Sequence, residues 1–155
     1  MNKKRVNLNT KKIVIGLVVA FLIIQFVPSD KSVPDYEKKF RLENAPMADL
    51  NEILPILNDA CYDCHSYDTR YPSYAYIAPV SWWMQGHVRN GRKALNFSTL
   101  LAGDSDEIKH ALYECAEEIE EGKMPPKGYV RMHSEADLSE SDRSKLVKWL
   151  KEQAI

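Results

Sequence analysis

Two cysteines and one histidine lie close together in the segment Cys61-Tyr62-Asp63-Cys64-His65. Thiols separated by two residues are spaced to add across the two vinyl groups of a haem, and a histidine directly after the second thiol can reach the iron. This CxxCH pattern indicates covalent, c-type haem attachment. The sequence therefore predicts one haem c, attached at Cys61 and Cys64, with His65 as an iron ligand.

Two other kinds of site also use closely spaced cysteine and histidine residues. A structural zinc site needs further ligands at finger-like spacing, and the remaining candidates, Cys115, His110 and His133, are not closely paired. A thioredoxin-like dithiol is expected within a βαβ pattern, which this sequence lacks. A non-haem metal-binding domain therefore stays as the weaker alternative.

A second iron ligand is expected on the opposite side of the haem from His65. Met124 follows a predicted helix and precedes two prolines, in Gly122-Lys123-Met124-Pro125-Pro126, so its backbone is expected to be rigid. Methionine also fills gaps in protein cores, which is the plain alternative. We predict Met124 as the distal ligand and keep His87, on a helix face near Trp83, as the alternative distal ligand.

Helices are expected to bring these ligands to the haem. Apolar residues at helical spacing predict a helix over residues 50–60 that leads into Cys61. Pro55 is expected to kink this helix or to start a second one. Further helices are predicted over residues 80–95 and 104–121, and the second of these has a clear apolar stripe.

The last two predicted helices carry recognisable end signals. Gly122 suits the C-cap of the helix that precedes it, and Ser139 with Asp142 approximates a capping box at the start of the final helix. Residues 66–79, rich in tyrosine and containing two prolines, predict an ordered loop. Few segments alternate with period two, so strands are not expected and the predicted fold class is all-α.

The N-terminal part differs in composition from the rest of the chain. Basic side chains are frequent in residues 1–12, and an almost uninterrupted apolar run follows from Ile13 to Val27. We predict a cytoplasmic basic tail and then a single transmembrane helix over residues 13–28 as a membrane anchor, with a secretory signal h-region as the alternative. The charge bias keeps the N-terminus in the cytoplasm. The haem domain is therefore expected on the periplasmic side of the inner membrane.

The remainder of the chain divides into a linker and one domain. Residues 29–47 are polar and contain prolines, which predicts a linker, and residues 48–155 are predicted to form the haem-binding domain. The formal net charge of −1 gives no reason to expect nucleic-acid binding. Cys115 has no cysteine left to pair with, and its place on an apolar stripe predicts an inert buried thiol.

Several short segments beyond the CxxCH motif point to one group of proteins. An N-terminal helix ending in CxxCH, a later Met-Pro and a closing terminal helix resemble a class I monohaem cytochrome c. More specific segments are Cys61–Ser66, Arg70-Tyr71-Pro72, Ala78-Pro79-Val80-Ser81-Trp82-Trp83, Gly91-Arg92 and Asn96-Phe97-Ser98. Over roughly residues 45–152 the chain thus resembles the bacterial haem-binding domain family of cytochrome c-like proteins. The resemblance implies a cytochrome c-like helical domain around one covalently bound haem.

Some further side chains have two interpretations. Tyr71, Trp82 and Trp83 either line the haem or pack in the core. Arg70 or Arg92 either pairs with a haem propionate, because a guanidinium matches carboxylate geometry, or lies at the surface. The acidic residues between positions 114 and 121 either steer a basic redox partner or form a solvated helix face.

Histidine–methionine ligation fills both axial positions of the iron and raises its reduction potential. The sequence is therefore interpreted as a membrane-anchored monohaem c-type cytochrome, an electron carrier rather than an enzyme. It is expected to transfer single electrons between protein redox partners in the periplasm. The alternative is a haem enzyme, such as a peroxidase, or a redox or gas sensor, each of which needs an open or labile distal position.

Overall fold

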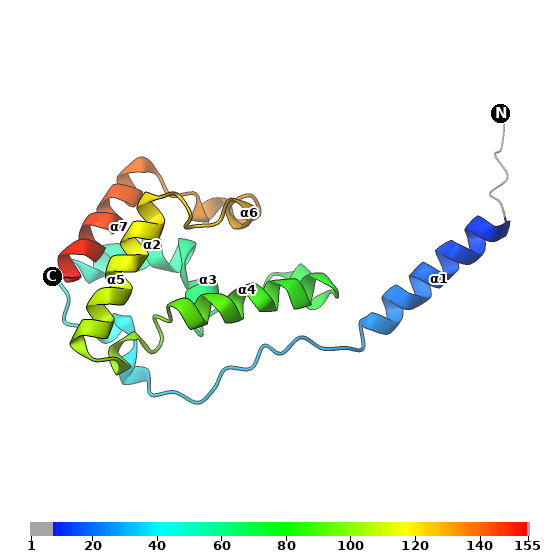
Figure 1. Cartoon of the computed structure of the whole chain (residues 1–155), viewed down its shortest axis with the longest axis horizontal. Helices are drawn as coiled ribbons and strands as arrows, with labels where there is room; N and C mark the ends of the chain where they lie inside the picture. Colours follow the sequence, from blue (N-terminus) through cyan, green and yellow to red (C-terminus); the bar gives the residue numbers. More distant parts are fainter. Residues whose placement is uncertain (1–7, 155) are drawn as a thin grey trace. The chain divides into compact units, whose positions relative to one another are not determined.

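The computed structural model describes residues 8–154 as helices joined by loops, and no strand occurs among these residues (Figure 1). The α-helices are α1 (Leu8–Ile24), α2 (Leu50–Ala60), α3 (Tyr62–His65), α4 (Val80–Ala94), α5 (Ser105–Glu120), α6 (Lys127–Val130) and α7 (Glu140–Gln153). Short 3₁₀ helices are η1 (Lys38–Phe40), η2 (Leu42–Asn44), η3 (Ser73–Tyr76), η4 (Leu100–Ala102) and η5 (Ser134–Ala136). The described part of the chain is therefore all-α.

The predicted transmembrane helix over residues 13–28 is wrong. Among residues 8–154, no helix combines the length and the apolar character needed to cross a membrane. The N-terminal helix, α1, starts among polar residues at Leu8 and ends at Ile24, before the apolar run is complete. Its 17 residues span about 26 Å at about 1.5 Å per residue, which is less than the hydrocarbon core of about 30 Å.

The chain divides into two compact units, of which the first contains Met1–Ser32 and Pro72–Gly86. Within this unit, the Gln25 side chain exchanges two hydrogen bonds with the backbone of Ala78. Gln25 Nε2 donates to the Ala78 carbonyl at 3.1 Å, and the Ala78 N–H donates to Gln25 Oε1 at 2.9 Å. The Trp82 indole N–H also donates to the Val27 carbonyl, at 3.0 Å. These bonds hold the end of α1 against the segment around η3.

The second unit contains Val33–Tyr71 and His87–Ile155 and has its own hydrophobic core. In this unit α5 packs against α7, and α2 packs against α3 and α7 (Figure 1). The apolar faces of these helices supply fully buried side chains, which include Leu57, Leu112, Leu146 and Leu150. The Trp149 indole N–H donates to the Ala48 carbonyl at 2.7 Å, so α7 is also tied to the chain that enters α2.

Helix α2 has the bounds that the apolar periodicity predicts, but Pro55 does not divide it. A proline inside a helix leaves the carbonyl four residues earlier without its usual donor. That carbonyl belongs to Asn51, and both residues are exposed, so water can supply the missing donor. α2 therefore runs unbroken to Ala60, directly before Cys61.

The capping signals predicted at Gly122 and Ser139 are confirmed, and the structure adds an N-cap at Asp104 that was not predicted. Asp104 accepts from the N–H groups of Asp106 and Glu107 and forms a full capping box with Glu107 at the start of α5. Ser139 Oγ accepts from the Asp142 N–H at 3.0 Å at the start of α7. Gly122 has a φ of 69°, which is the left-handed conformation that favours glycine after a helix.

The segment before α2, predicted as a linker, contributes to the core of the second unit. Leu42 is completely buried, and its N–H donates to the Phe97 carbonyl at 2.9 Å. The Arg41 guanidinium pairs with Glu43 at 2.7 Å and also with Asp68. The chain is therefore packed against the domain from about residue 41, ahead of the predicted domain start at residue 48.

Candidate haem site

The CxxCH motif forms a single helical turn at the end of α2. The Cys61 N–H donates to the Leu57 carbonyl at 2.8 Å, and the His65 N–H donates to the Cys61 carbonyl at 2.9 Å. Residues three and four apart on a helical turn share one face. Cys61, Cys64 and His65 therefore present their side chains on the same side of this turn.

All three cysteines of the chain are free thiols and half-buried. Burial raises the pKa of the Cys64 thiol to about 11 and raises the pKa of Cys61 well above its usual value. Because the thiolate is the reactive form of cysteine, both sulfurs are in their less reactive, protonated form at neutral pH. Burial likewise raises the pKa of Cys115 to about 12, as expected for an inert thiol.

The loop that follows α4 fixes the orientation of the His65 imidazole and leaves one ring nitrogen able to bind a metal. Its Nδ1 lies 3.1 Å from the Leu95 carbonyl oxygen, so Nδ1–H is the donor and the lone pair of Nε2 is left for a metal. Burial lowers the pKa of His65, which keeps the ring neutral at neutral pH. Neutral imidazole is the form that binds metals.

The end of α4 lies directly against the CxxCH turn. A Cβ atom on Gly91 would be only 2.6 Å from the Cys64 carbonyl oxygen, so the absence of a side chain permits this close approach. Arg92 Nε donates to the Ser66 carbonyl at 2.7 Å, one residue beyond the motif. Gly91 and Arg92 thus hold the CxxCH turn in place through a close backbone contact and a hydrogen bond.

The aspartate inside the motif is buried and strongly hydrogen-bonded. Asp63 is 5% exposed, and its Oδ1 accepts from the Arg70 N–H at 2.7 Å. Its Oδ2 accepts from the Tyr129 hydroxyl at 2.6 Å. Sequence reasoning missed Asp63 and Tyr129, because nothing in the pattern marks a carboxylate between the cysteines as buried.

The two candidate distal ligands have different surroundings. Met124 is half-buried and packs against the hydrophobic core of the second unit, whereas His87 is exposed on α4. The Met124 N–H donates to the Glu118 carbonyl at 3.1 Å, and the Met124 carbonyl accepts from Arg143 Nη1 at 3.4 Å. The backbone of Met124 is thus held by α5 and α7.

The aromatic and arginine side chains with two sequence interpretations lie in different parts of the structure. Trp82 and Trp83 are exposed and belong to the first unit, while Tyr71 is half-buried in the second. Arg70 and Arg92 both donate to protein groups near the CxxCH turn: Arg70 to Asp63, and Arg92 to the Ser66 carbonyl. Both guanidinium groups therefore brace the loop that follows the motif.

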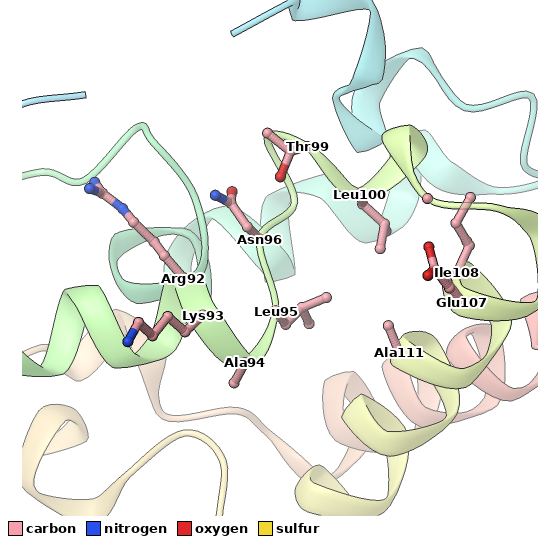
Figure 2. Close-up of a pocket in the computed structure, with 11 residues that line it drawn as sticks. Arg92, Lys93, Ala94, Leu95, Asn96, Thr99, Leu100, Glu107, Ile108 and Ala111 are labelled. Atoms are coloured by element: carbon pink, nitrogen blue, oxygen red, sulfur yellow. The ribbon is translucent and has the colours of Figure 1, made fainter. Parts of the chain in front are cut away.

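An open cavity of about 270 Å³ lies between the loop after α4 and the face of α5. Figure 2 shows the apolar side chains of Leu95, Leu100, Ile108 and Ala111 around it. None of the predicted iron ligands or attachment cysteines lines this cavity. Within residues 8–154, no group of three or more His, Cys, Asp or Glu side chains is arranged to hold a metal ion.

The side chains of the second unit fit a haem. They supply two thiols and a neutral imidazole nitrogen on one helical turn. They also supply half-buried apolar side chains that pack against the core, namely Cys61, Leu95, Ala111, Cys115 and Met124. The family model described as the haem-binding domain matches residues 19–152. The chain belongs to the haem-binding domain family.

A more distant likeness extends to a larger protein. This chain is 22% identical over 120 residues to the cytochrome c peroxidase Ccp of Escherichia coli (strain K12). The match covers 75% of this chain and 26% of that relative, so this chain spans about a quarter of the relative's length. No solved structure matches the chain.

Proposed function

We propose that this haem-binding domain attaches one haem c through Cys61 and Cys64, with His65 as the proximal iron ligand. Each thiol would add across one vinyl group, its sulfur bonding to one vinyl carbon and its hydrogen to the other. The observation that carries this proposal is the placement of both thiols and the neutral His65 imidazole on one side of a single helical turn. The bond from Nδ1 to the Leu95 carbonyl supports Nε2 as the iron-binding atom.

Met124 is the proposed distal ligand. Its half-buried side chain at the edge of the core supports this role over His87, which lies in the same unit but is exposed. Backbone bonds to α5 and α7 limit the movement of Met124. If His65 and Met124 both bound the iron, they would leave no open iron position for small ligands such as peroxide.

The proposed function is single-electron transfer between protein redox partners. When bound, the haem supplies one-electron chemistry by cycling between Fe(III) and Fe(II). The side chains hold the cofactor and set its surroundings, and no catalytic residue is required. We further propose that the domain works in the periplasm, with the apolar N-terminal segment serving as the h-region of an export signal.

A second candidate function is peroxide reduction. The likeness to the cytochrome c peroxidase of E. coli favours it, although the match covers only 26% of that relative. This function needs a distal position that opens, so the Met124 side chain would have to leave the iron. A spin-state measurement separates the two candidates, because electron transfer predicts a stable six-coordinate, low-spin site.

The test uses the full chain, expressed together with a c-type haem maturation system. Visible spectra are recorded in both redox states for the wild type, for Met124→Ala and for Met132→Ala, a control at a methionine that is 64% exposed. We expect low-spin spectra with a methionine–iron band in the wild type and the control, and loss of the band with a lower potential in Met124→Ala. A five-coordinate, high-spin wild type would contradict the electron-carrier proposal, and an unaltered Met124→Ala spectrum would contradict Met124 ligation.

A further inference from the structure

We propose that the hydrogen bond between Tyr129 and Asp63 positions the distal ligand. It joins the segment that carries Met124 to the motif that carries His65, and so keeps the two sides of the site at a constant separation. Asp63 and Tyr129 are then positioning residues that favour methionine ligation. This inference rests on the proposed function, because it takes Met124 as the distal ligand.

The Asp63 side chain is rigidly held. It lies within the attachment motif and is almost completely buried. Its Oδ1 accepts from the Arg70 N–H at 2.7 Å and from Arg70 Nε at 3.3 Å. The Thr69 hydroxyl donates to its backbone carbonyl at 2.7 Å. The carboxylate is therefore a stationary acceptor, attached by the backbone to Cys64 and His65.

The donor to Asp63 is Tyr129, which lies on α6, five residues after Met124. Its hydroxyl donates to Asp63 Oδ2 at 2.6 Å, across a sequence separation of 66 residues. Hydrogen bonds to an ionised acceptor are shorter and roughly twice as strong as neutral ones. The Tyr129 ring also stacks on His133, with 4.3 Å between centroids, which orients the hydroxyl.

The segment 124–129 is held at both ends. At its start, the Met124 N–H donates to the Glu118 carbonyl at 3.1 Å, and Arg143 Nη1 donates to the Met124 carbonyl at 3.4 Å. At its end, Tyr129 is bound to the CxxCH turn itself. α6 is a single turn without a side-chain cap at its N-terminus, so its own helical bonds resist displacement weakly. Losing the Tyr129 bond should therefore let the Met124 side chain leave the iron more often.

The experiment measures how easily imidazole displaces the methionine in the oxidised, haem-loaded full chain. Tyr129→Phe removes the donor, and Tyr113→Phe is the matched control at a tyrosine that is 47% exposed on α5. We expect imidazole to bind about tenfold more tightly to Tyr129→Phe, because a hydrogen bond to a charged group is lost. Tyr113→Phe should bind imidazole like the wild type.

Asp63→Asn is the second variant. Its amide has a single acceptor oxygen, which stays with the two Arg70 donors at the Oδ1 position, so Nδ2–H₂ faces the Tyr129 hydroxyl and the bond to Tyr129 becomes a neutral one. Because the charge accounts for roughly half the strength of such a bond, we expect a smaller change, about threefold. This variant also provides the test if Tyr129→Phe fails to accumulate. Hydrogen–deuterium exchange of residues 124–130 should be faster in both variants than in the control.

The possible failures are distinguishable. Wild-type imidazole affinity and wild-type exchange in both Tyr129→Phe and Asp63→Asn would overturn the positioning role and leave Met124 ligation intact. Equal tightening in Tyr129→Phe and Tyr113→Phe would also overturn it, because the effect would not depend on the bond to Asp63. A wild type without a methionine–iron band would instead contradict the proposed ligand set.

Discussion

At the scale of single residues, the His65 imidazole is held in one tautomer and one charge state by its surroundings. The Leu95 carbonyl accepts from Nδ1, and burial lowers the pKa of the ring. Such outer partners orient a metal-binding histidine and raise its basicity as a ligand. The backbone of the loop after α4 therefore helps to set the orientation and tautomer of the His65 ring.

Gly91 provides a test of this support. Gly91→Ala would place a Cβ 2.6 Å from the Cys64 carbonyl oxygen, and the resulting overpacking should cost about 1–3 kcal/mol of unfolding free energy. Gly86→Ala, on the same helix with nothing within 4 Å of the new Cβ, is the matched control. Alanine should stabilise the helix there by about 0.5–1 kcal/mol. Denaturant unfolding of both variants measures the difference in unfolding free energy. An equal change in the two variants would show that α4 does not pack closely against the CxxCH turn.

At the scale of elements, the core of the second unit extends ahead of α2. Leu42 lies in η2, is completely buried and is bonded through its backbone to Phe97. Phe97 in turn donates its N–H to the His65 carbonyl at 2.8 Å. η2 is therefore connected through Phe97 to the backbone of His65.

Leu42→Ala tests whether η2 is part of the folded domain. Removing a fully buried leucine side chain should lower the free energy of unfolding by about 2–5 kcal/mol. Val33→Ala, at a residue that is 44% exposed, is the control and should change it by no more than about 0.5 kcal/mol. Thermal unfolding of the haem-loaded variants gives the comparison. A Leu42→Ala protein as stable as the control would mean that this segment is a loose linker.

The helices were predicted more accurately than the connections between them. α2, α4 and α5 match the predicted ranges within about one residue, because apolar periodicity and capping residues are local signals. Leu42 lies between Arg41 and Glu43 in a short segment without helical or strand periodicity, so nothing in the sequence pattern marks it as buried. The bond from Tyr129 to Asp63 joins residues 66 positions apart, and a single sequence does not reveal which distant polar groups meet.

The N-terminal prediction failed for a related physical reason. The apolar run suggested a span from its composition, but the length of a helix depends on where its ends form. α1 begins earlier and ends earlier than the run, and its last turn is followed by the bonds of Gln25 and Trp82 to the backbone. Hydropathy alone contains no information on those bonds.

At the scale of the whole molecule, the predicted haem site belongs to one unit. Cys61, Cys64, His65 and Met124 all lie in the second unit, as does the entire hydrophobic core cluster. The first unit contains α1 and the segment around η3. Haem binding should therefore depend little on the N-terminal residues themselves.

A shortened chain tests this division. Residues 1–32 are replaced by an unrelated, cleavable export signal, so that the mature protein begins at Val33. We expect the same haem content and the same visible spectrum as in the full chain, because the core cluster begins at Leu42. Haem content is measured per mole of purified protein. A shortened protein that reaches the periplasm but lacks haem would show that the N-terminal part is needed for the site.

The most direct test of covalent haem attachment is a denaturing gel stained for haem. The full chain, the double variant Cys61→Ala/Cys64→Ala and the control Cys115→Ala are expressed with a c-type maturation system. We predict that stain remains with the wild type and Cys115→Ala and is absent from the double variant. A wild-type protein without stain, or a double variant that keeps it, would contradict haem attachment at Cys61 and Cys64.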